Sequence, residues 1–146
     1  MATDRRAAKR SRASAKKAGA DFEIRQGEYL SVALENPYIS RQDKNGSSDL
    51  GDLAFVGYRA AGLKGLSEWS VPITLECKNT ATMNLASAVR EAHTEAGNYR
   101  AKHGGPAPLP ILMHKRHGVA DPGRQWVTME ADTFVRLLRI AEGAEQ

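Results

Sequence analysis

The stretch ITLECKNTATMNLASAV, residues 73–89, decides the fold because it joins the end of an apolar strand to the start of a long helix. Side chains alternate between the two faces of a strand, so Glu76 and Lys78 share one face and Cys77 takes the other. A charged pair at a strand end is an ordinary surface feature in most proteins. The neighbouring segments therefore decide whether this pair carries chemistry.

The hydrophobic pattern predicts an α/β protein with a mixed central β-sheet flanked by helices. The expected elements are a helix at 19–34, a strand at 38–41, a loop at 43–51, strands at 52–58 and 71–78, a helix at 80–102, strands at 109–116 and 124–129, and a helix at 131–141. Their order is α-β-β-β-α-β-β-α. The glycine-bearing connection between strands 52–58 and 71–78 predicts that these two strands pair antiparallel.

Both long helices show apolar stripes that should face the sheet. The expected buried residues are Phe22, Ile24, Tyr29, Leu30 and Ala33 in the first helix, and Leu85, Ala88, Val89, Ala92, Ala96 and Tyr99 in the second. The strand at 109–113 and the helix at 131–141 are the candidates for a dimer surface, although core packing explains both equally well.

Composition points to a water-soluble chain of one domain plus a tail. The chain has 146 residues, of which 41% are hydrophobic and 26% are charged. No run reaches the roughly 20 apolar residues that a membrane-spanning helix needs, and the basic N-terminus lacks the apolar segment of a secretory signal. A single cysteine cannot form an internal disulfide, which favours a reducing compartment such as the cytoplasm.

The positive charge is concentrated at the N-terminus. Residues 1–20 contain seven basic residues and one acid, whereas the rest has fourteen basic and sixteen acidic residues. The basic residues are Arg5, Arg6, Lys9, Arg10, Arg12, Lys16 and Lys17. Segment 1–18 lacks the apolar side chains of a core and is expected to be a disordered arm, with the folded domain at 19–146. Such an arm binds phosphate backbones, or is simply a solvated tail.

Two acids on neighbouring strands suggest a metal site. Asp52 opens one strand and Glu76 lies near the end of the next, so antiparallel pairing brings the two carboxylates within a few ångströms. They repel each other unless a cation such as Mg²⁺ lies between them. Lys78 would then point at a metal-bound water or a phosphate oxygen, and the main-chain carbonyl of Cys77 could add a ligand. The alternative is surface charge at strand ends.

The order of these residues resembles the PD-(D/E)xK nuclease superfamily, and more narrowly its phage and archaeal Holliday junction resolvases. The motif is carried by Gly51-Asp52-Leu53 on one strand and Leu75-Glu76-Cys77-Lys78 on the next, followed by a long helix. The segment KKAGADFEIRQGEYL, residues 16–30, resembles the family's first helix, whose metal-facing glutamate is here Glu23. The resemblance implies a restriction-endonuclease-like core.

The sequence departs from the family pattern at two places. Glycine replaces the proline before Asp52, and Asp49 lies close enough to be a rival ligand, although Asp52 opens the strand directly. Many relatives carry a glutamine in the helix after the E-x-K motif, whereas this chain has Glu91 and Glu95 there. The role of that glutamine therefore cannot be transferred.

The resemblance implies an endodeoxyribonuclease that resolves four-way DNA junctions with Mg²⁺, for which Mn²⁺ is the expected substitute. Glu23, Asp52 and Glu76 would bind the metal, with the Cys77 carbonyl as a further ligand, and Lys78 would orient the attacking water. A homodimer would cut both strands, as in a phage protein of a bacterial cytoplasm. The expected DNA contacts are the seven basic residues of the arm together with Arg41, Ser47, Lys115 and Arg116.

Two alternatives stay open beside the resolvase. One is another structure-selective or restriction-like nuclease of the same fold, and the other is a non-catalytic DNA-binding module. Four histidines and one cysteine without a C-x-x-C or H-x-x-x-H pair argue against structural zinc. A phosphate-binding glycine loop for a small-molecule nucleotide is not present in the sequence. Cys77 is expected to be a buried, inert thiol.

Overall fold

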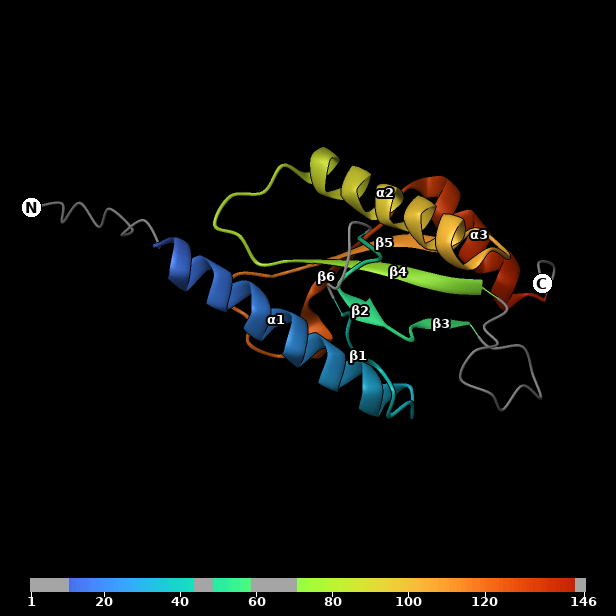
Figure 1. Cartoon of the computed structure of the whole chain (residues 1–146). Coiled ribbons are helices and arrows are strands. Elements are labelled where there is room, and N and C mark those ends of the chain that lie inside the picture. Colours follow the sequence, from blue (N-terminus) through green and yellow to red (C-terminus); the bar gives the residue numbers. More distant parts are fainter. Residues whose placement is uncertain (1–10, 44–48, 59–70, 144–146) are drawn as a thin grey trace, which may run out of the picture.

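The structure is a computed structural model that describes residues 11–43, 49–58 and 71–143 (Figure 1). Its elements are α1 (Arg12–Ala33), β1 (Ser40–Arg41), β2 (Leu53–Ala54), β3 (Gly57–Tyr58), β4 (Val71–Lys78), α2 (Leu85–His103), β5 (Leu109–His114), a short 3-10 helix (Pro122–Arg124), β6 (Trp126–Thr128) and α3 (Ala131–Ala141). The predicted α/β class is confirmed.

The sheet is mixed, as predicted. Its strands run in the order β1-β2-β4-β5-β6, and β3 also pairs with β4. The β4–β5 pair is parallel and all the other pairs are antiparallel. Because parallel neighbours need a crossover, α2 connects β4 to β5 over one face of the sheet.

The helices lie on both faces of the sheet. Figure 1 shows α1 on one side of the strands and α2 on the other, and Ile140 of α3 joins the core that contains Phe22 of α1. Helix α1 contacts β1 and β4, α2 contacts β4 and β5, and α3 contacts β5. The end of β4 therefore lies between α1 and α2, which is the part of the fold that carries Glu76, Cys77 and Lys78.

Apolar side chains from α1, the sheet and α3 form the main core. The buried residues are Phe22, Ile39, Leu53, Val56, Val71, Leu75, Cys77, Leu109, Ile111, Met113 and Ile140. The odd-numbered residues of β4 supply three of these side chains, so the even-numbered residues, Glu76 among them, face the opposite way. Alternation thus gives Cys77 the core face that the sequence predicted.

The predicted strand 52–58 is divided into two shorter strands, so four strands and not three precede α2. The division falls at Phe55, whose φ is 62° and whose side chain is 46% exposed. A left-handed residue cannot continue a regular ladder. Both halves still pair antiparallel with β4, as expected, through Leu53 opposite Leu75 and Gly57 opposite Pro72.

The first helix begins earlier than predicted, within the segment 1–18 that the sequence assigned to the N-terminal arm. Helix α1 starts at Arg12, and the Ser11 hydroxyl caps it by accepting a hydrogen bond from the Ser14 amide at 3.2 Å. Serine is a preferred N-cap residue, and the following alanines favour the helix. Arg5, Arg6, Lys9 and Arg10 lie outside the described residues.

The buried stripe of α1 also differs from the prediction. Ile24 and Tyr29 are exposed, whereas Glu23, Gln26 and Gly27 are buried beside Phe22. Gln26 is satisfied there, because its side-chain amide donates to the Pro122 carbonyl at 3.1 Å. A Cβ on Gly27 would lie 3.3 Å from the Leu53 side chain, so the glycine allows a close approach of helix and sheet.

Helix α2 starts five residues later than predicted. Asn84 caps it by accepting from the Ser87 amide at 3.0 Å, and Gly104 ends it with a φ of 67°. Its buried face consists of Ala88, Ala92, Glu95 and Ala96, while the predicted Leu85 is exposed. Small side chains bring α2 close to the sheet.

The remaining boundaries agree closely with the sequence. Strand Val71–Lys78 and helix Ala131–Ala141 are confirmed at both ends, whereas β1, β5 and β6 are shorter than predicted. Strand 109–113, a candidate either for a dimer surface or for the core, contributes to the core, because Leu109 and Leu112 are fully buried. Within the described ranges, no helix is long and apolar enough to cross a membrane.

Candidate active site

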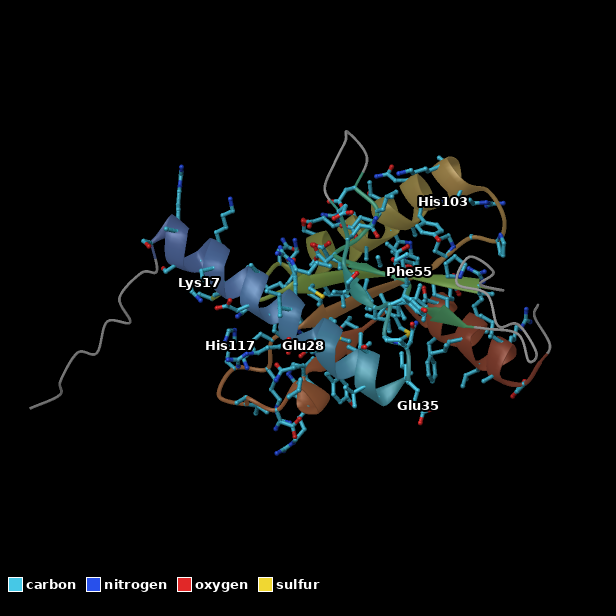
Figure 2. The ribbon with its side chains drawn as sticks, turned by 60° about the horizontal axis from the view of Figure 1, so that its bottom comes forward. Lys17, Glu28, Glu35, Phe55, His103 and His117 are labelled. Atoms are coloured by element: carbon cyan, nitrogen blue, oxygen red, sulfur yellow. The ribbon has the colours of Figure 1, made fainter. Side chains whose placement is uncertain are left out.

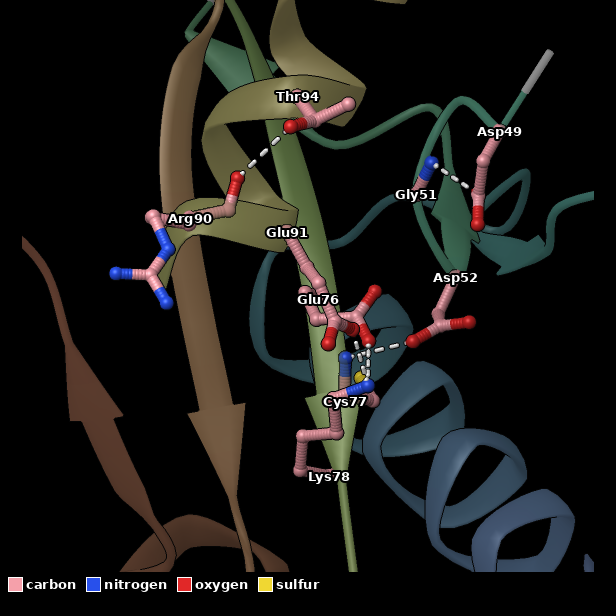
Figure 3. Close-up of polar contacts among 9 residues, drawn as sticks. All are labelled: Asp49, Gly51, Asp52, Glu76, Cys77, Lys78, Arg90, Glu91 and Thr94. Carbon is pink, nitrogen blue, oxygen red and sulfur yellow. Dashed lines mark hydrogen bonds and ion pairs between the residues drawn. The ribbon is translucent and has the colours of Figure 1, made fainter. Parts of the chain in front are cut away.

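Asp52 lies immediately before β2, beside the end of β4. Its amide donates to the Leu75 carbonyl at 2.8 Å, and one of its carboxylate oxygens accepts a hydrogen bond from the Cys77 amide at 2.7 Å. The residue is buried. Backbone pairing therefore holds the Asp52 carboxylate against the strand segment that carries Glu76 and Lys78, as Figure 3 shows.

The glycine before Asp52 has a structural reason. Gly51 has a φ of +97°, and a Cβ built on it would lie 3.0 Å from the Thr74 side chain and 3.1 Å from the Leu75 carbonyl oxygen. Proline is locked near −65° and cannot adopt this conformation. Glycine rather than proline is thus required by the path of the chain at this position.

Lys78 forms ion pairs with two acids, one from its own strand and one from α2. Its ammonium lies 2.5 Å from a Glu76 oxygen and 2.5 Å from a Glu91 oxygen (Figure 3). Burial alone would lower the pKa of Lys78, but the hydrogen bonds to Glu76 and Glu91 outweigh burial and raise it. Lys78 is therefore a cation that donates hydrogen bonds and cannot act as a base near neutral pH.

Glu95 places a second carboxyl group beside that of Glu76. Burial first, and then its hydrogen bond with Glu76, raise the pKa of Glu95 to about 11. Burial also raises the pKa of Glu76, as does the Asp52 charge, against the hydrogen bonds of Glu95 and Lys78. The two glutamates therefore share a proton near neutral pH, as closely spaced carboxyl groups do. The second oxygen of Glu95, Oε2, is buried without a hydrogen-bond partner in the described part of the chain.

Sequence reasoning noted Glu95 and gave it no role. The available signal was its phase: Glu95 follows Ala88 and Ala92 at helical spacing and so falls on the face that those alanines turn to the sheet. A glutamate in an alanine stripe is a buried charge and needs a partner. Glu91, one turn earlier, is about half exposed and pairs with Lys78 at the edge of the same cluster.

Glu23, the predicted glutamate of the first helix, is buried on α1 and pairs with Arg41. The Arg41 Nε donates to a Glu23 oxygen at 2.8 Å, and the Arg41 side chain is 45% exposed. The structure thus joins two predicted site residues that were given different roles, a metal ligand and a DNA contact. Both roles stay predictions.

Cys77 is the core-facing thiol that the sequence predicted. Burial, followed by the charges of Asp52 and Glu23, raises its pKa well above the ordinary value, so the thiol stays protonated. A protonated, buried thiol is unreactive. In the parallel ladder Cys77 pairs with Met113, and the ligand role of its main-chain carbonyl stays a prediction.

The acids of this cluster suit a hard cation in chemistry but do not form a closed metal site. Among residues 11–43, 49–58 and 71–143, no group of three histidine, cysteine, aspartate or glutamate side chains could hold a metal ion. The donors are nevertheless carboxylate oxygens, which Mg²⁺ prefers, and Glu95 Oε2 is a buried oxygen without a partner. Asp52, Glu76 and Glu95 therefore fit a divalent ion by donor type.

The predicted DNA contacts within the described residues lie at one end of the molecule, apart from Arg41. Figure 2 shows Lys17 on the first half of α1 and His117 after β5 at this end, with His103 at the other. Lys17 pairs with Asp21, and the Arg116 guanidinium lies 4.6 Å from the centre of the Trp126 ring. Ser47 lies outside the described residues.

Two adjoining hollows at this end are lined in part by lysine and arginine side chains. One, of about 200 Å³, is lined by Lys78, His114, Lys115 and His117 together with Thr80, Ala81 and Met83. Lys115 also lines the second, of about 200 Å³, between α1 and the end of β4, where Arg25 and Asn79 lie. Lys115 thus connects the two hollows between Lys78 and α1, and Asp21 is an acid in the lining of the second.

Comparison of the chain with protein-family models, with curated proteins and with solved structures gives no significant match. The functional assignment therefore rests on the site itself.

Proposed function

We propose that this protein is a metal-dependent endodeoxyribonuclease with a restriction-endonuclease-like core, which resolves four-way DNA junctions by phosphodiester hydrolysis. The observation that carries the proposal is the position of Asp52. Its carboxylate is held by the Cys77 amide at 2.7 Å, beside Glu76 and the charged Lys78. An aspartate, a glutamate and a lysine at the meeting point of two antiparallel strands are what metal-assisted phosphate hydrolysis requires.

Each residue has a separate part in the reaction. Asp52 and Glu76 would hold the ion, with Glu23 and the Cys77 carbonyl as further predicted ligands. A bound Mg²⁺, or Mn²⁺ in its place, would supply Lewis-acid activation of water and of the scissile phosphate. Lys78 donates hydrogen bonds as an ammonium, so it orients the attacking water and stabilises charge that develops on a phosphate oxygen.

The basic surface supports DNA as the partner. The hollow that contains Lys78 is also lined by Lys115, so a DNA backbone that follows these two lysines reaches the site. Arg12, Lys16 and Lys17 are exposed on the first turns of α1 at the same end of the molecule. Arg41, which pairs with Glu23, is a further proposed DNA contact.

A homodimer would place two such sites on one junction. As a phage or prophage gene product, the protein would act on recombining DNA in the cytoplasm of a bacterial host. Helix α3 supports self-association, because Phe134, Val135 and Leu138 are each about half exposed on it. Exposed apolar side chains that gather on one helix mark interaction surfaces. A C2 dimer has the symmetry of the junction.

The test is cleavage of labelled four-way, flap and linear duplex DNAs with Mg²⁺. The proposal expects paired cuts in the four-way junction at a higher rate than in the other two. Faster cleavage of flaps or linear duplex would instead identify another nuclease of this fold. Binding of all three DNAs without any cleavage in Mg²⁺ or Mn²⁺ would identify a non-catalytic DNA-binding module.

A further inference from the structure

Glu95 is the one acid on the buried face of α2. It is 4% exposed and follows Ala88 and Ala92 along the helix. Alanine side chains are too short to reach polar groups of the sheet, so Glu95 alone extends from this face to β4, where it bonds to Glu76. The helix is thus packed closely enough to bring a third carboxyl group to Asp52 and Glu76.

The second oxygen of Glu95 does not contribute to the packing of the fold. Oε2 is buried and has no hydrogen-bond partner among the described residues. A buried polar atom without a partner destabilises a protein, and alanine at this position would avoid that cost. An oxygen held in this way is one that a ligand can use.

A hollow lies beside the Glu95 side chain. A hollow of about 360 Å³ is lined by Glu95, Glu91 and Asp49, with Ser87, Arg90 and Thr94 on the helix side. The hollow therefore brings solvent up to the Glu95 side of the cluster. The acidic lining attracts cations rather than phosphate groups.

We propose that Glu95 is a ligand of the divalent ion, beside Asp52 and Glu76. This inference rests on the proposed function, since it concerns the ion of the same site. Carboxylate oxygens from a few side chains together with water are the usual ligands of Mg²⁺ and Mn²⁺. By contrast, the carboxylate of Glu23 is already paired with Arg41 at 2.8 Å.

Lys78 would still pair with Glu91 if Glu76 held the metal ion. Its ammonium contacts Glu91 as well as Glu76, each at 2.5 Å. The Glu91 contact would keep the lysine beside the site if the Glu76 carboxylate held the metal. Glu91 is thus a positioning residue for Lys78, and Glu95 a ligand.

The test is calorimetric titration of the full chain with Mn²⁺, comparing wild type, Glu95→Gln and Glu91→Gln. Both variants replace one carboxyl group of the same helix by an amide, so Glu91→Gln is the matched control for Glu95→Gln. We expect Glu95→Gln to weaken Mn²⁺ binding at least about tenfold more than the control does. Equal affinities in the two variants would overturn the ligand role.

Thermal melting provides a second readout that does not depend on activity. In EDTA, Glu95→Gln should melt at or above the wild-type temperature, because it removes a buried carboxyl group, yet Mn²⁺ should raise its melting temperature less than that of wild type. An equal increase contradicts the inference. If the glutamine variant does not fold, Glu95→Asp replaces it in the test. Aspartate keeps the carboxyl group but has a shorter side chain, so this variant should bind Mn²⁺ less tightly than wild type. Unchanged binding would overturn the ligand role.

The two proposals fail in different ways. If wild type binds no Mn²⁺, the metal-dependent nuclease is rejected and Glu95 as its ligand with it. If wild type binds Mn²⁺ and Glu95→Gln binds it as tightly as Glu91→Gln does, only the role of Glu95 is rejected.

Discussion

The carboxylate of Asp52 is fixed to β4 by the backbone amide of Cys77, at 2.7 Å. This contact joins two segments that are far apart in sequence, and it sets the position of one acid relative to the next, Glu76. Because the donor is a backbone group within a paired strand, side-chain rotation of Cys77 cannot release it. The geometry of the proposed site is therefore a consequence of the sheet register.

Asp52→Asn should abolish cleavage while DNA binding and folding persist. Asparagine retains an oxygen for the Cys77 amide but loses the charge that binds a cation, so we expect the Mg²⁺-dependent rate to fall by at least about 100-fold. Cleavage assays and gel shifts on the same four-way junction measure the two effects.

Asp49→Asn is the matched control for this substitution. Asp49 lies three residues earlier and accepts a hydrogen bond from the Gly51 amide at 3.1 Å, which asparagine can also accept. The control should keep most of its cleavage activity. A larger loss from Asp49→Asn than from Asp52→Asn would show that the wrong aspartate was assigned.

Gly51→Ala should destabilise the protein. Its φ of +97° and the contacts at 3.0 Å and 3.1 Å leave no room for a methyl group. We expect the free energy of unfolding to fall by about 1–3 kcal/mol. Chemical denaturation measures it, with Gly97→Ala as the control, because nothing lies within 4 Å of a Cβ built on that helical glycine. A neutral Gly51→Ala would refute the strained turn.

Stability in EDTA should fall as pH rises. The pKa of Glu95 is raised from 4.5 to about 11, so across this interval the folded chain binds a proton that the unfolded chain has lost. The free energy of unfolding should therefore decrease with pH between these values, by at most about 1.4 kcal/mol per pH unit for one proton.

Glu95→Gln should flatten this pH dependence, since glutamine does not titrate. Glu28→Gln, at an exposed position of α1, should leave it unchanged. Denaturation curves at a series of pH values provide the comparison. The same slope of unfolding free energy against pH in wild type and Glu95→Gln would mean that groups other than Glu95 control the pH dependence of stability.

Lys16→Gln should lower the salt dependence of DNA binding. Lys16 is exposed on the first turns of α1, where we place the DNA backbone. Losing one phosphate contact reduces the slope of log affinity against log salt by about 1. Lys102→Gln is the control, because it removes an exposed charge near His103 at the other end of the molecule (Figure 2). Equal slopes for the two variants would exclude this end of α1 from the interface.

The strongest patterns predicted the fold well. Strand Val71–Lys78 is a continuous apolar run and helix Ala131–Ala141 has one sharply apolar face, and both were placed at their observed bounds. The break at Phe55 could not be predicted, because its positive φ is imposed by the tertiary fold and has no sequence signal. The start of α1 at Arg12 depends on the Ser11 cap, a weak local signal within a basic segment.

The candidate site was predicted only as far as chain order allows. Strand pairing and the alternation of side chains bring Asp52, Glu76 and Lys78 together. Both can be predicted from the sequence, so this part of the site was predicted. The contact between Glu76 and Glu95 depends on the rotation of α2 over the sheet, which tertiary packing sets. The pairing of Glu23 with Arg41 likewise joins segments whose distance only the folded structure defines.

The most direct measurement is the Mg²⁺-dependent cleavage rate of a labelled four-way junction by wild type and by Glu76→Gln, with EDTA as the blank. The account predicts paired incisions by wild type in Mg²⁺, none in EDTA, and a rate for Glu76→Gln at least about 100-fold lower with junction binding retained. Equal cleavage by the two proteins in Mg²⁺, or cleavage by wild type that persists in EDTA, would contradict a metal site built on Glu76.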